Sequence, residues 1–467
     1  MEAFVANNPF MTVVPLLVML ILVVLTKRVF EPILIAIAFV YILKDGWSAM
    51  DDNFIIGIID GIYDVFGDPE ATYPWIVLML SLFGGLIAVL IRSGGISGFK
   101  RFATRYIKSE RSSLLVTWGL GMILFVDDYI NNLAIGPTVR NITDTHKVPR
   151  EQLGFSICCT GTPECALVPI TAFAVFTYEA IMVGEGVSAS GSNMITEYVK
   201  IIPFLFYPIV IILISLFLAL GVLPRVGAFK RYYKELQDGT YALTDAEKAM
   251  VGETEDEIEI DESKGNILDF LLPVIILVVI MLITSDLVLS VIFALILAFL
   301  MYVIRKKMTI GEFFESFFSG IGDMIFILVV VLMTFVFVEG LNSLGFSEYV
   351  IDVVSPMLSG GAIPALTFIT VGVIAFLGVD YWAVMLLIAP VAIPLSEQFA
   401  VSPYMTVAAI VSGSVFGGTA CFFAEQILMC SQAVQRPPVK VAIGGLPYSV
   451  FGGVIAVGLF LVFGFAL

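Results

Sequence analysis

The sequence predicts an all-α polytopic membrane protein, and its composition and the length of its apolar runs carry that prediction. Of the 467 residues, 59% are hydrophobic and 14% are charged, and the mean hydropathy is +1.01. This leaves too little polar surface to cover a soluble globule of that size. Many apolar runs are continuous and approach the roughly 20 residues that cross a bilayer, whereas a membrane β-barrel shows short alternating segments. We expect about 10–12 helical spans, some of them broken.

The same composition excludes several function classes. The net charge of −16 argues against nucleic acid as a partner, and the acidic run Glu253–Glu262 is typical of a solvated loop. The five cysteines lie in or beside apolar stretches without the spacing of a disulfide framework or a zinc site. They have no partnering histidine at membrane depth, and no G-x-x-x-x-G-K-[ST] motif occurs. We therefore expect neither an enzyme nor an ATP-driven pump, and no cofactor.

Residues 1–223 form the predicted first transmembrane half. Lys27 and Arg28 follow the first apolar run rather than precede it, so the run is read as an anchor and not as a signal peptide. Basic residues on both flanks of 113–139 favour a re-entrant hairpin that enters from the cytoplasm. Pro163 interrupts a helix predicted at 153–183. The other apolar segments of this half are 10–26, 30–43, 73–91 and 201–223.

A cytoplasmic linker at 224–265, basic at its start and acidic at its end, separates the two predicted halves. Residues 266–467 form the second half. The loops on either side of 362–394 contain no Lys or Arg, so this second hairpin is expected to enter from outside. A Gly-rich broken helix at 404–430 follows it. The other apolar segments of this half are 267–284, 287–304, 322–341 and 442–466.

The two halves contain an internal repeat. Phe125–Pro137 and Phe376–Pro390 each hold Asp-Tyr followed by apolar residues and proline. Chance is the alternative for any single match, because Gly and Pro are common in membrane helices. Together with the opposite sidedness of the hairpins, the repeat predicts inverted topology, in which broken helices of both halves meet near the bilayer midplane and form the transport site.

The strongest candidate site lies in the first of these repeated stretches. Asp127 and Asp128 are adjacent acids inside an apolar segment, where an Asp costs about 2.5–3.5 kcal/mol and usually faces water, a partner or an ion. The alternative is a loop at the membrane edge whose acids lie in water. Because hard cations prefer oxygen ligands, we predict a site for a hard cation such as sodium at Asp128, Asn132 and Thr160. The full predicted ion or substrate set is Asp127, Asp128, Asn131, Asn132, Thr160, Thr162, Glu164, Asp380, Ser412, Ser414, Thr419 and Glu425.

Exchange of a proton for a cation such as Na+ at one buried Asp is the simplest mechanism that this site predicts, with H+ and the cation as the coupling ions. Glu164 and Glu425 are near-symmetric intramembrane acids and candidates for a proton or ion role. The alternative for each is a carboxylate that caps an unwound helix end.

A block of residues around the first hairpin has a distinctive pattern: Phe125–Gly136, then Arg140, Asp144, His146-Lys147, Arg150 and Leu153. With this block, the sequence resembles the NhaC-type sodium/proton antiporter family of the ion-transporter superfamily. The resemblance extends more faintly over most of the chain, including Ser412–Gly417. It implies a homodimer in the cell membrane that moves sodium and protons by an elevator-like, alternating-access motion of a transport domain against a dimeric scaffold.

The sequence also departs from that family. Members typically carry Asp-Ser-Thr-Ala-Ala-Pro where this chain has Cys158–Pro163, and Asp-His where it has Gly418-Thr419. The loss of these ionisable groups makes the predicted centre less like a cation cage and roomier for an organic group. The alternative function is therefore sodium- or proton-coupled transport, including symport, of a small organic solute such as an amino acid or carboxylate. The pocket residues predicted for it are Cys158, Cys421, Phe422, Phe423 and Trp382.

Overall fold

The structure confirms the all-α fold class with broken helices, because every regular element in the described part of the chain is helical. The structure is a computed structural model. It describes residues 9–26, 30–45, 63, 72–94, 105–125, 128–189, 192–242, 266–284, 286–346, 349, 359–377, 381–422 and 424–466.

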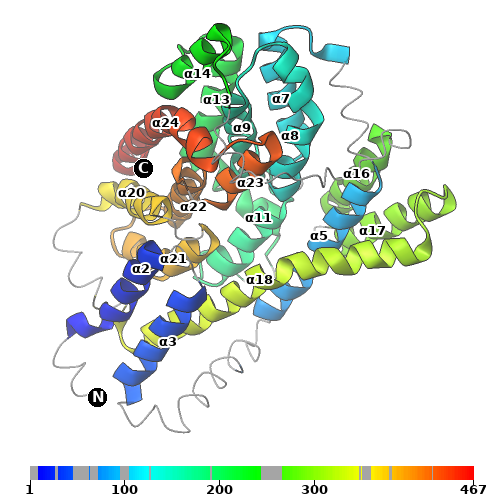
Figure 1. The fold of residues 1–467 in the computed structure, drawn as a ribbon. Helices are drawn as coiled ribbons and strands as arrows, with labels where there is room; N and C mark the ends of the chain where they lie inside the picture. The colour runs from blue at the N-terminus through cyan, green and yellow to red at the C-terminus, as the bar shows by residue number, and fades with distance from the viewer. Residues whose placement is uncertain are drawn as a thin grey trace.

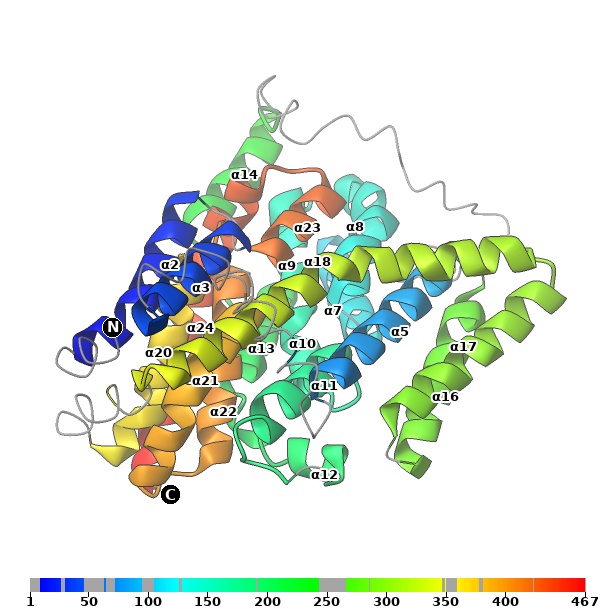
Figure 2. The same cartoon turned by 90° about the horizontal axis from the view of Figure 1, so that it is seen from below.

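Six long helices form an outer layer. They are α2 (Val14–Thr26), α3 (Phe30–Asp45), α5 (Thr72–Arg92), α16 (Ile267–Thr284), α17 (Leu287–Ile304) and α18 (Ile310–Ser343). Helix α18 packs along α5 and crosses α3, while the α16–α17 pair packs against α5 through α17 (Figure 2). Each predicted half of the chain supplies three of these six helices.

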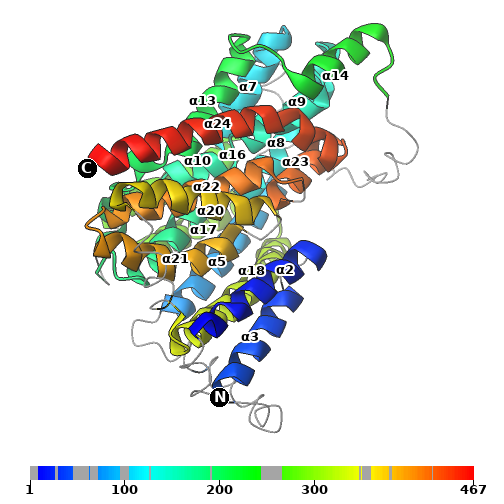
Figure 3. The same cartoon turned by 90° about the vertical axis from the view of Figure 1, so that its left-hand side faces the viewer.

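The remaining helices form an inner bundle (Figures 1 and 3). Its elements from the first half and the linker are α7 (Glu110–Ile123), α8 (Asp128–Thr145), α9 (Arg150–Cys158), α10 (Thr162–Leu167), α11 (Ala172–Phe176), the π-helical turn η3 (Thr177–Val183), α12 (Met194–Tyr198), α13 (Phe206–Leu220) and α14 (Gly227–Asp238). Those from the second half are α20 (Ile363–Phe376), α21 (Tyr381–Gln398), α22 (Pro403–Ala420), α23 (Glu425–Val434) and α24 (Pro438–Ala466). The inner bundle meets the outer layer where α18 packs on α21 and where α5 packs on α11 and η3.

Four interruptions in the inner bundle create new helix starts. Within 113–139, α7 ends at Ile123 and α8 begins at Asp128, and within 362–394, α20 ends at Phe376 and α21 begins at Tyr381. Helix α9 is separated from α10 by residues 159–161, and α22 ends at Ala420 before α23 begins at Glu425. Proline does not end every helix, because Pro390 and Pro394 remain inside α21. The breaks instead follow stretches in which polar residues and glycine interrupt an apolar run.

By length and composition alone, three helices of the described residues are suited to cross a membrane, and the number rises to five if each of two bent helix pairs counts as one span. The bends are 47° and 64°. Several other apolar helices of the described residues are 10–17 residues long. The total of about 10–12 spans stays a prediction.

The predicted linker begins with an ordered, amphipathic helix. Helix α14 packs against α24, and its aromatic residues Phe229, Tyr232 and Tyr233 are buried. Tyr448 of α24 donates to the carbonyl oxygen of Pro224 and accepts from the backbone N–H of Val226, both at 2.9 Å. The start of the linker is therefore fixed to the inner bundle, and residues 243–265 lie outside the described part of the chain.

Small residues allow the helices of the second half to approach closely. A Cβ added at Gly417 of α22 would lie 2.1 Å from the Cβ of Ala375 in α20, which is closer than two carbon atoms can come. Membrane helices gain stability from such contacts, because lipid and apolar side chains are equally hydrophobic and van der Waals packing decides which helices associate.

We predict that Gly417→Ala destabilises the protein by about 1–3 kcal/mol, because the added methyl group forces α20 and α22 apart. The matched control is Gly458→Ala in α24, where an added Cβ meets no heavy atom within 4 Å and the higher helix propensity of Ala is weakly favourable. Thermal unfolding of both variants in detergent checks this. Equal unfolding temperatures for the two variants would contradict the close packing.

Candidate functional site

Asp128 begins α8 and is the centre of the candidate site. Its side chain is 4% exposed. The hydroxyl of Thr162, the first residue of α10, donates to Oδ2 of Asp128 at 2.8 Å. The hydroxyl of Tyr381, the first residue of α21, donates to the same oxygen at 3.2 Å. The carboxylate therefore joins the starts of three helices, two from the first half of the chain and one from the second.

Asn131 holds two interrupted helices together, one turn further along α8. Its Nδ2 atom donates to the carbonyl oxygen of Gly121 at 2.8 Å and to that of Thr160 at 3.1 Å. These carbonyls belong to the last turn of α7 and to the break after α9, where the helical hydrogen-bond pattern ends. Within the described residues, Oδ1 of Asn131 has no hydrogen-bond partner.

Asn132 faces the second half of the chain. The thiol of Cys430 on α23 donates to Oδ1 of Asn132 at 3.4 Å, and among the described residues Nδ2 of Asn132 has no partner. The thiol of Cys158 on α9 points to the carbonyl oxygen of Gly418 on α22, with sulfur and oxygen 3.9 Å apart. All of these side chains are buried. The break in each broken helix is thus close to the first turns of α8.

The structure brings only part of the predicted set together around Asp128. The backbone carbonyl of Thr160 accepts from Asn131, but the Thr160 hydroxyl turns away and donates to the carbonyls of Ser156 and Ile157 in the preceding helix α9. On α22, the hydroxyl of Ser414 donates to Val411 O at 2.9 Å, and that of Thr419 bonds to Tyr207 of α13 at 2.6 Å. Ser412 is buried with no partner for its hydroxyl among the described residues. Of these three hydroxyls on α22, only that of Thr419 joins the helix to another one within the described residues.

The two predicted glutamates differ in their surroundings. Glu164 in α10 is 3% exposed, and its Oε2 has no hydrogen-bond partner in the part of the chain that the structure describes. Glu425 is the first residue of α23 and is half-buried, a place where a carboxylate also stabilises the helix N-terminus. Asp127, Asp380 and Phe423 lie outside the described residues.

Aromatic side chains cover one side of Asp128. The Trp382 ring stacks edge-on against Phe176 with centroids 4.5 Å apart, and Phe173 packs against both Tyr381 and Trp382. Of the other predicted pocket residues, Cys421 is buried at the end of α22, and Phe422 contacts Phe376 at a centroid distance of 6.1 Å. Trp382 thus lies beside the site, while Phe422 lies after α22 and contacts the end of α20.

Sequence reasoning missed three residues of this centre: Tyr381, Cys430 and Gln426. Tyr381 belongs to the repeated Asp-Tyr pair, so the repeat itself was a signal for it. Cys430 follows Gln426 by one helical turn on α23, and both are buried. An uncharged polar residue inside the predicted broken helix at 404–430 was the sequence signal that could have identified Gln426.

Comparison with known proteins identifies the class of this protein. A family model described as the Na+/H+ antiporter family matches residues 165–465, which is more than half of the chain. The chain belongs to the Na+/H+ antiporter family. The resemblance to NhaC-type antiporters is therefore confirmed, and the chain is a secondary transporter in a membrane and not an enzyme. The Asp128 region precedes the matched residues.

Similar proteins cover nearly the whole of this antiporter-family chain. An uncharacterized protein of Haemophilus influenzae is 23% identical over 487 residues, which span 96% of this chain and 90% of that protein. The structure of Neisseria gonorrhoeae MtrF is similar with a TM-score of 0.59 and 14% identity, covering 90% of this chain and 86% of that one. The structure of the Alcanivorax borkumensis YdaH transporter is similar with a TM-score of 0.55 and 14% identity, covering 90% of each chain. At such identity the two structures share the fold with this antiporter-family chain.

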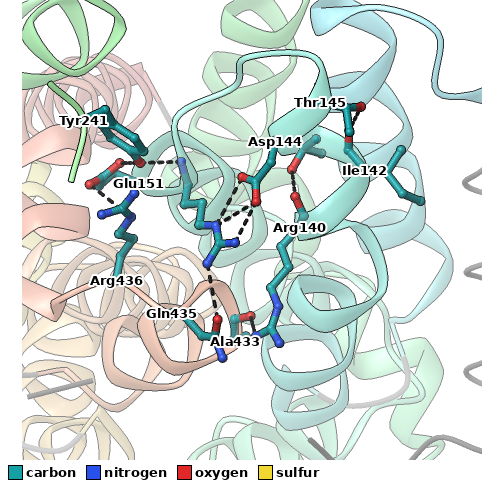
Figure 4. A network of polar contacts seen from close by, with 11 residues as sticks. Arg140, Ile142, Asp144, Thr145, Glu151, Tyr241, Ala433, Gln435 and Arg436 are labelled. Carbon is teal, nitrogen blue, oxygen red and sulfur yellow. Dashed lines mark hydrogen bonds and ion pairs between the residues drawn. The ribbon is translucent and has the colours of Figure 1, made fainter. Parts of the chain in front are cut away.

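A polar network ties the end of α8 to α9, α23 and the linker of this antiporter-family protein (Figure 4). Arg140 and Asp144 are four residues apart on α8, a spacing that allows an ion pair. In the structure Asp144 instead pairs with Arg150, whose Nη2 lies 2.6 Å from Oδ2. The Nη1 atom of Arg140 donates to the carbonyl oxygen of Ala433 on α23 at 3.3 Å.

Glu151 is the buried acid of this network. It is 1% exposed, and it accepts a hydrogen bond from the hydroxyl of Tyr241 while Nε of Arg436 lies 3.7 Å from its Oε1. The Tyr241 hydroxyl also accepts the backbone N–H of Arg150 at 2.9 Å. Burial, together with the charge of Glu151, raises the pKa of Tyr241, so the phenol keeps its proton and remains a donor at neutral pH. The network fixes the end of the ordered linker to the inner bundle.

We predict that Tyr241→Phe destabilises the protein by about 1–3 kcal/mol, because it removes one partner from a buried carboxylate and one from a backbone N–H. Tyr106→Phe, at a half-exposed tyrosine, is the control and is expected to change stability little. Thermal unfolding of the two variants measures the difference. If Tyr241→Phe unfolds at the wild-type temperature, the linker is not held by this hydroxyl.

Proposed function

We propose that this chain is a sodium/proton antiporter of the plasma membrane and that Asp128 is the site at which the two ions compete. One observation carries the proposal: a buried carboxylate accepts hydrogen bonds from the first residues of α10 and α21 at the point where both halves of the chain meet. An ionised carboxylate away from water is costly unless a cation or a proton neutralises it. Binding of one ion therefore displaces the other.

The surroundings of Asp128 supply further oxygen ligands for sodium. Oδ1 of Asn131 has no hydrogen-bond partner among the described residues, and Thr162 and Tyr381 place hydroxyl oxygens within 3.2 Å of the carboxylate. Hard cations prefer such oxygens. In this proposal the sodium site keeps Asp128 from the sequence prediction, while Asn131 and Thr162 take the place of Asn132 and Thr160.

The division into layers supports an elevator-like mechanism of alternating access. The inner bundle holds the candidate site, and it contacts the outer layer at few places, mainly through α18 with α21 and α5 with α11. Each predicted half contributes three outer helices and two pairs of interrupted helices, an arrangement that inverted repeats would give. We propose that the outer layer is the scaffold of a homodimer against which the inner bundle moves.

A second function, coupled transport of a small organic solute, is favoured by a different observation. Nδ2 of Asn132 is buried beside the site and has no hydrogen-bond partner among the described residues, and a donor of this kind cannot coordinate sodium. The structurally similar MtrF is described as illuminating a class of antimetabolite efflux pumps, which makes an organic cargo compatible with this fold.

We predict that Asp128→Asn abolishes sodium-evoked proton movement, because the amide binds neither a proton nor sodium as a carboxylate does. The measurement uses proteoliposomes with a trapped pH dye and pulses of sodium, lithium and potassium chloride. Asp144→Asn is the matched control on the same helix, since Asp144 is partly exposed and pairs with Arg150. It is expected to respond like the wild type.

Either of two results would refute the antiport proposal. Wild-type liposomes that show no pH change on any cation pulse would exclude cation/proton exchange. A full response from Asp128→Asn would exclude Asp128 as the exchange site.

A further inference from the structure

The carboxamide of Gln426 is the most conspicuous buried polar group that the proposed exchange at Asp128 does not use. The residue lies in the first turn of α23 and is 1% exposed. Neither its Nε2 nor its Oε1 has a hydrogen-bond partner in the described part of the chain. Burying both a donor and an acceptor without partners is unfavourable, so the arrangement points to a ligand that supplies the missing hydrogen bonds.

The packing of α23 against α8 places this carboxamide at the level of Asp128. Cys430 contacts Asn132, and further along both helices Gly136 is packed against Ala433, so the helices run in the same direction. One turn back from Asn132 is Asp128, and one turn back from Cys430 is Gln426. Residues four apart share one face of a helix, and the two side chains therefore lie on facing surfaces.

Gly418 on α22 makes room for the Gln426 side chain. A Cβ at this position would lie 2.7 Å from Oε1 of Gln426, too close for the carboxamide to stay where it is. The carbonyl of the same glycine faces the Cys158 thiol. The absence of a side chain at 418 thus lets the carboxamide lie between the end of α22 and the start of α23.

The unpartnered atoms at this place define the chemistry of a ligand. Nε2 of Gln426 and Nδ2 of Asn132 are two donors without partners among the described residues, and Oε1 of Gln426 is an acceptor. The helices α8 and α23 both begin here, and helix N-termini favour negative charge. Two donors beside helix starts match a carboxylate, and the neighbouring acceptor matches an ammonium group.

A purely anionic solute fits less well. It would bring its charge next to Asp128 and leave Oε1 of Gln426 facing other acceptors. The basic residues that follow on these segments, Arg140 after Asp128 and Arg436 after Gln426, are about three helical turns further along. A zwitterion supplies its own positive charge.

We propose that Gln426 and Asn132 bind the carboxylate and ammonium groups of an α-amino acid. Both amide nitrogens donate to the carboxylate, and Oε1 of Gln426 accepts from the ammonium group. The inference rests on the proposed exchange at Asp128, because the amino acid is the cargo whose movement that exchange drives. The aromatic cluster of Phe173, Tyr381 and Trp382, which reaches Asp128 through the Tyr381 hydroxyl, offers an apolar surface for the side chain of the amino acid.

The test is ligand-induced thermal stabilisation of the purified full chain in sodium chloride, with each of the twenty L-amino acids as the probe. At least one L-amino acid is expected to raise the unfolding temperature. The decarboxylated amine and the deaminated acid of that same compound are expected to leave it unchanged, because each lacks one of the two groups that the carboxamides bind.

Variants of Gln426 connect the stabilisation to this side chain. Gln426→Met keeps the length of the side chain and removes its hydrogen bonds, so the amino acid is expected to bind about ten-fold more weakly or worse. Gln426→Asn keeps the amide but withdraws it by one methylene, so it is also expected to weaken binding. It serves as the test variant if Gln426→Met fails to fold. Gln432→Met, on the exposed side of the same helix, is the matched control and binds like the wild type.

Failure of this inference is distinguishable from failure of the antiport proposal. If no amino acid stabilises the wild type, or if Gln426→Met binds it normally, the inference is overturned, and sodium-evoked proton movement in liposomes is unaffected. If that proton movement is itself absent from the wild type, the exchange at Asp128 fails first, and the amino acid loses its driving reaction.

Discussion

Backbone carbonyls at interrupted helix ends need hydrogen-bond donors from the protein, because the hydrocarbon of a membrane supplies none. In this chain the Nδ2 atom of Asn131 is that donor for Gly121 at the end of α7 and for Thr160 after α9. One carboxamide therefore sets the position of both breaks relative to α8. Because Asp128 lies less than one turn before Asn131 and Thr162 lies two residues after Thr160, the contact between Asp128 and Thr162 follows from the same constraint.

Polar clusters at two ends of the inner bundle keep this centre in register. At one end Glu197 of α12 pairs with Lys200 at 2.6 Å and accepts from the Tyr404 hydroxyl of α22 at 2.8 Å. At the other end Glu151 and Tyr241 hold the linker after α14. Figure 2 places α12 and α14 at opposite ends of the molecule. A bundle fixed at both ends is suited to move as one body against the outer layer.

The sequence was sufficient to predict the helical membrane fold and the neighbourhood of the breaks. Glycine, proline and acidic residues inside long apolar runs are local signals, and Pro163, predicted to interrupt a helix, lies at the observed start of α10. The partners of Asp128 and Asn132 were beyond such reasoning. Tyr381 is 253 residues from Asp128, and Cys430 is 298 residues from Asn132, so only the tertiary fold reveals these contacts.

The turn after α8 gives Asp144 a different ion-pair partner from the one that helical spacing suggests. Helical spacing suggested Arg140 as a partner for Asp144, but α8 ends at Thr145 and Lys147 adopts a φ of 57°. This left-handed turn brings Arg150 back to Asp144. The number of spans stays unsettled by sequence for a related reason, since bends of 47° and 64° turn apolar runs of sufficient length into pairs of short helices.

Direct competition between sodium and protons at Asp128 is tested most simply without transport. The purified full chain is placed in weakly buffered detergent solution with a pH dye, and sodium chloride is added, with choline chloride as the control salt. Sodium is predicted to release protons from the wild type, and choline is not. Sodium binding that stabilises the protein against heat but releases no protons would contradict a shared site.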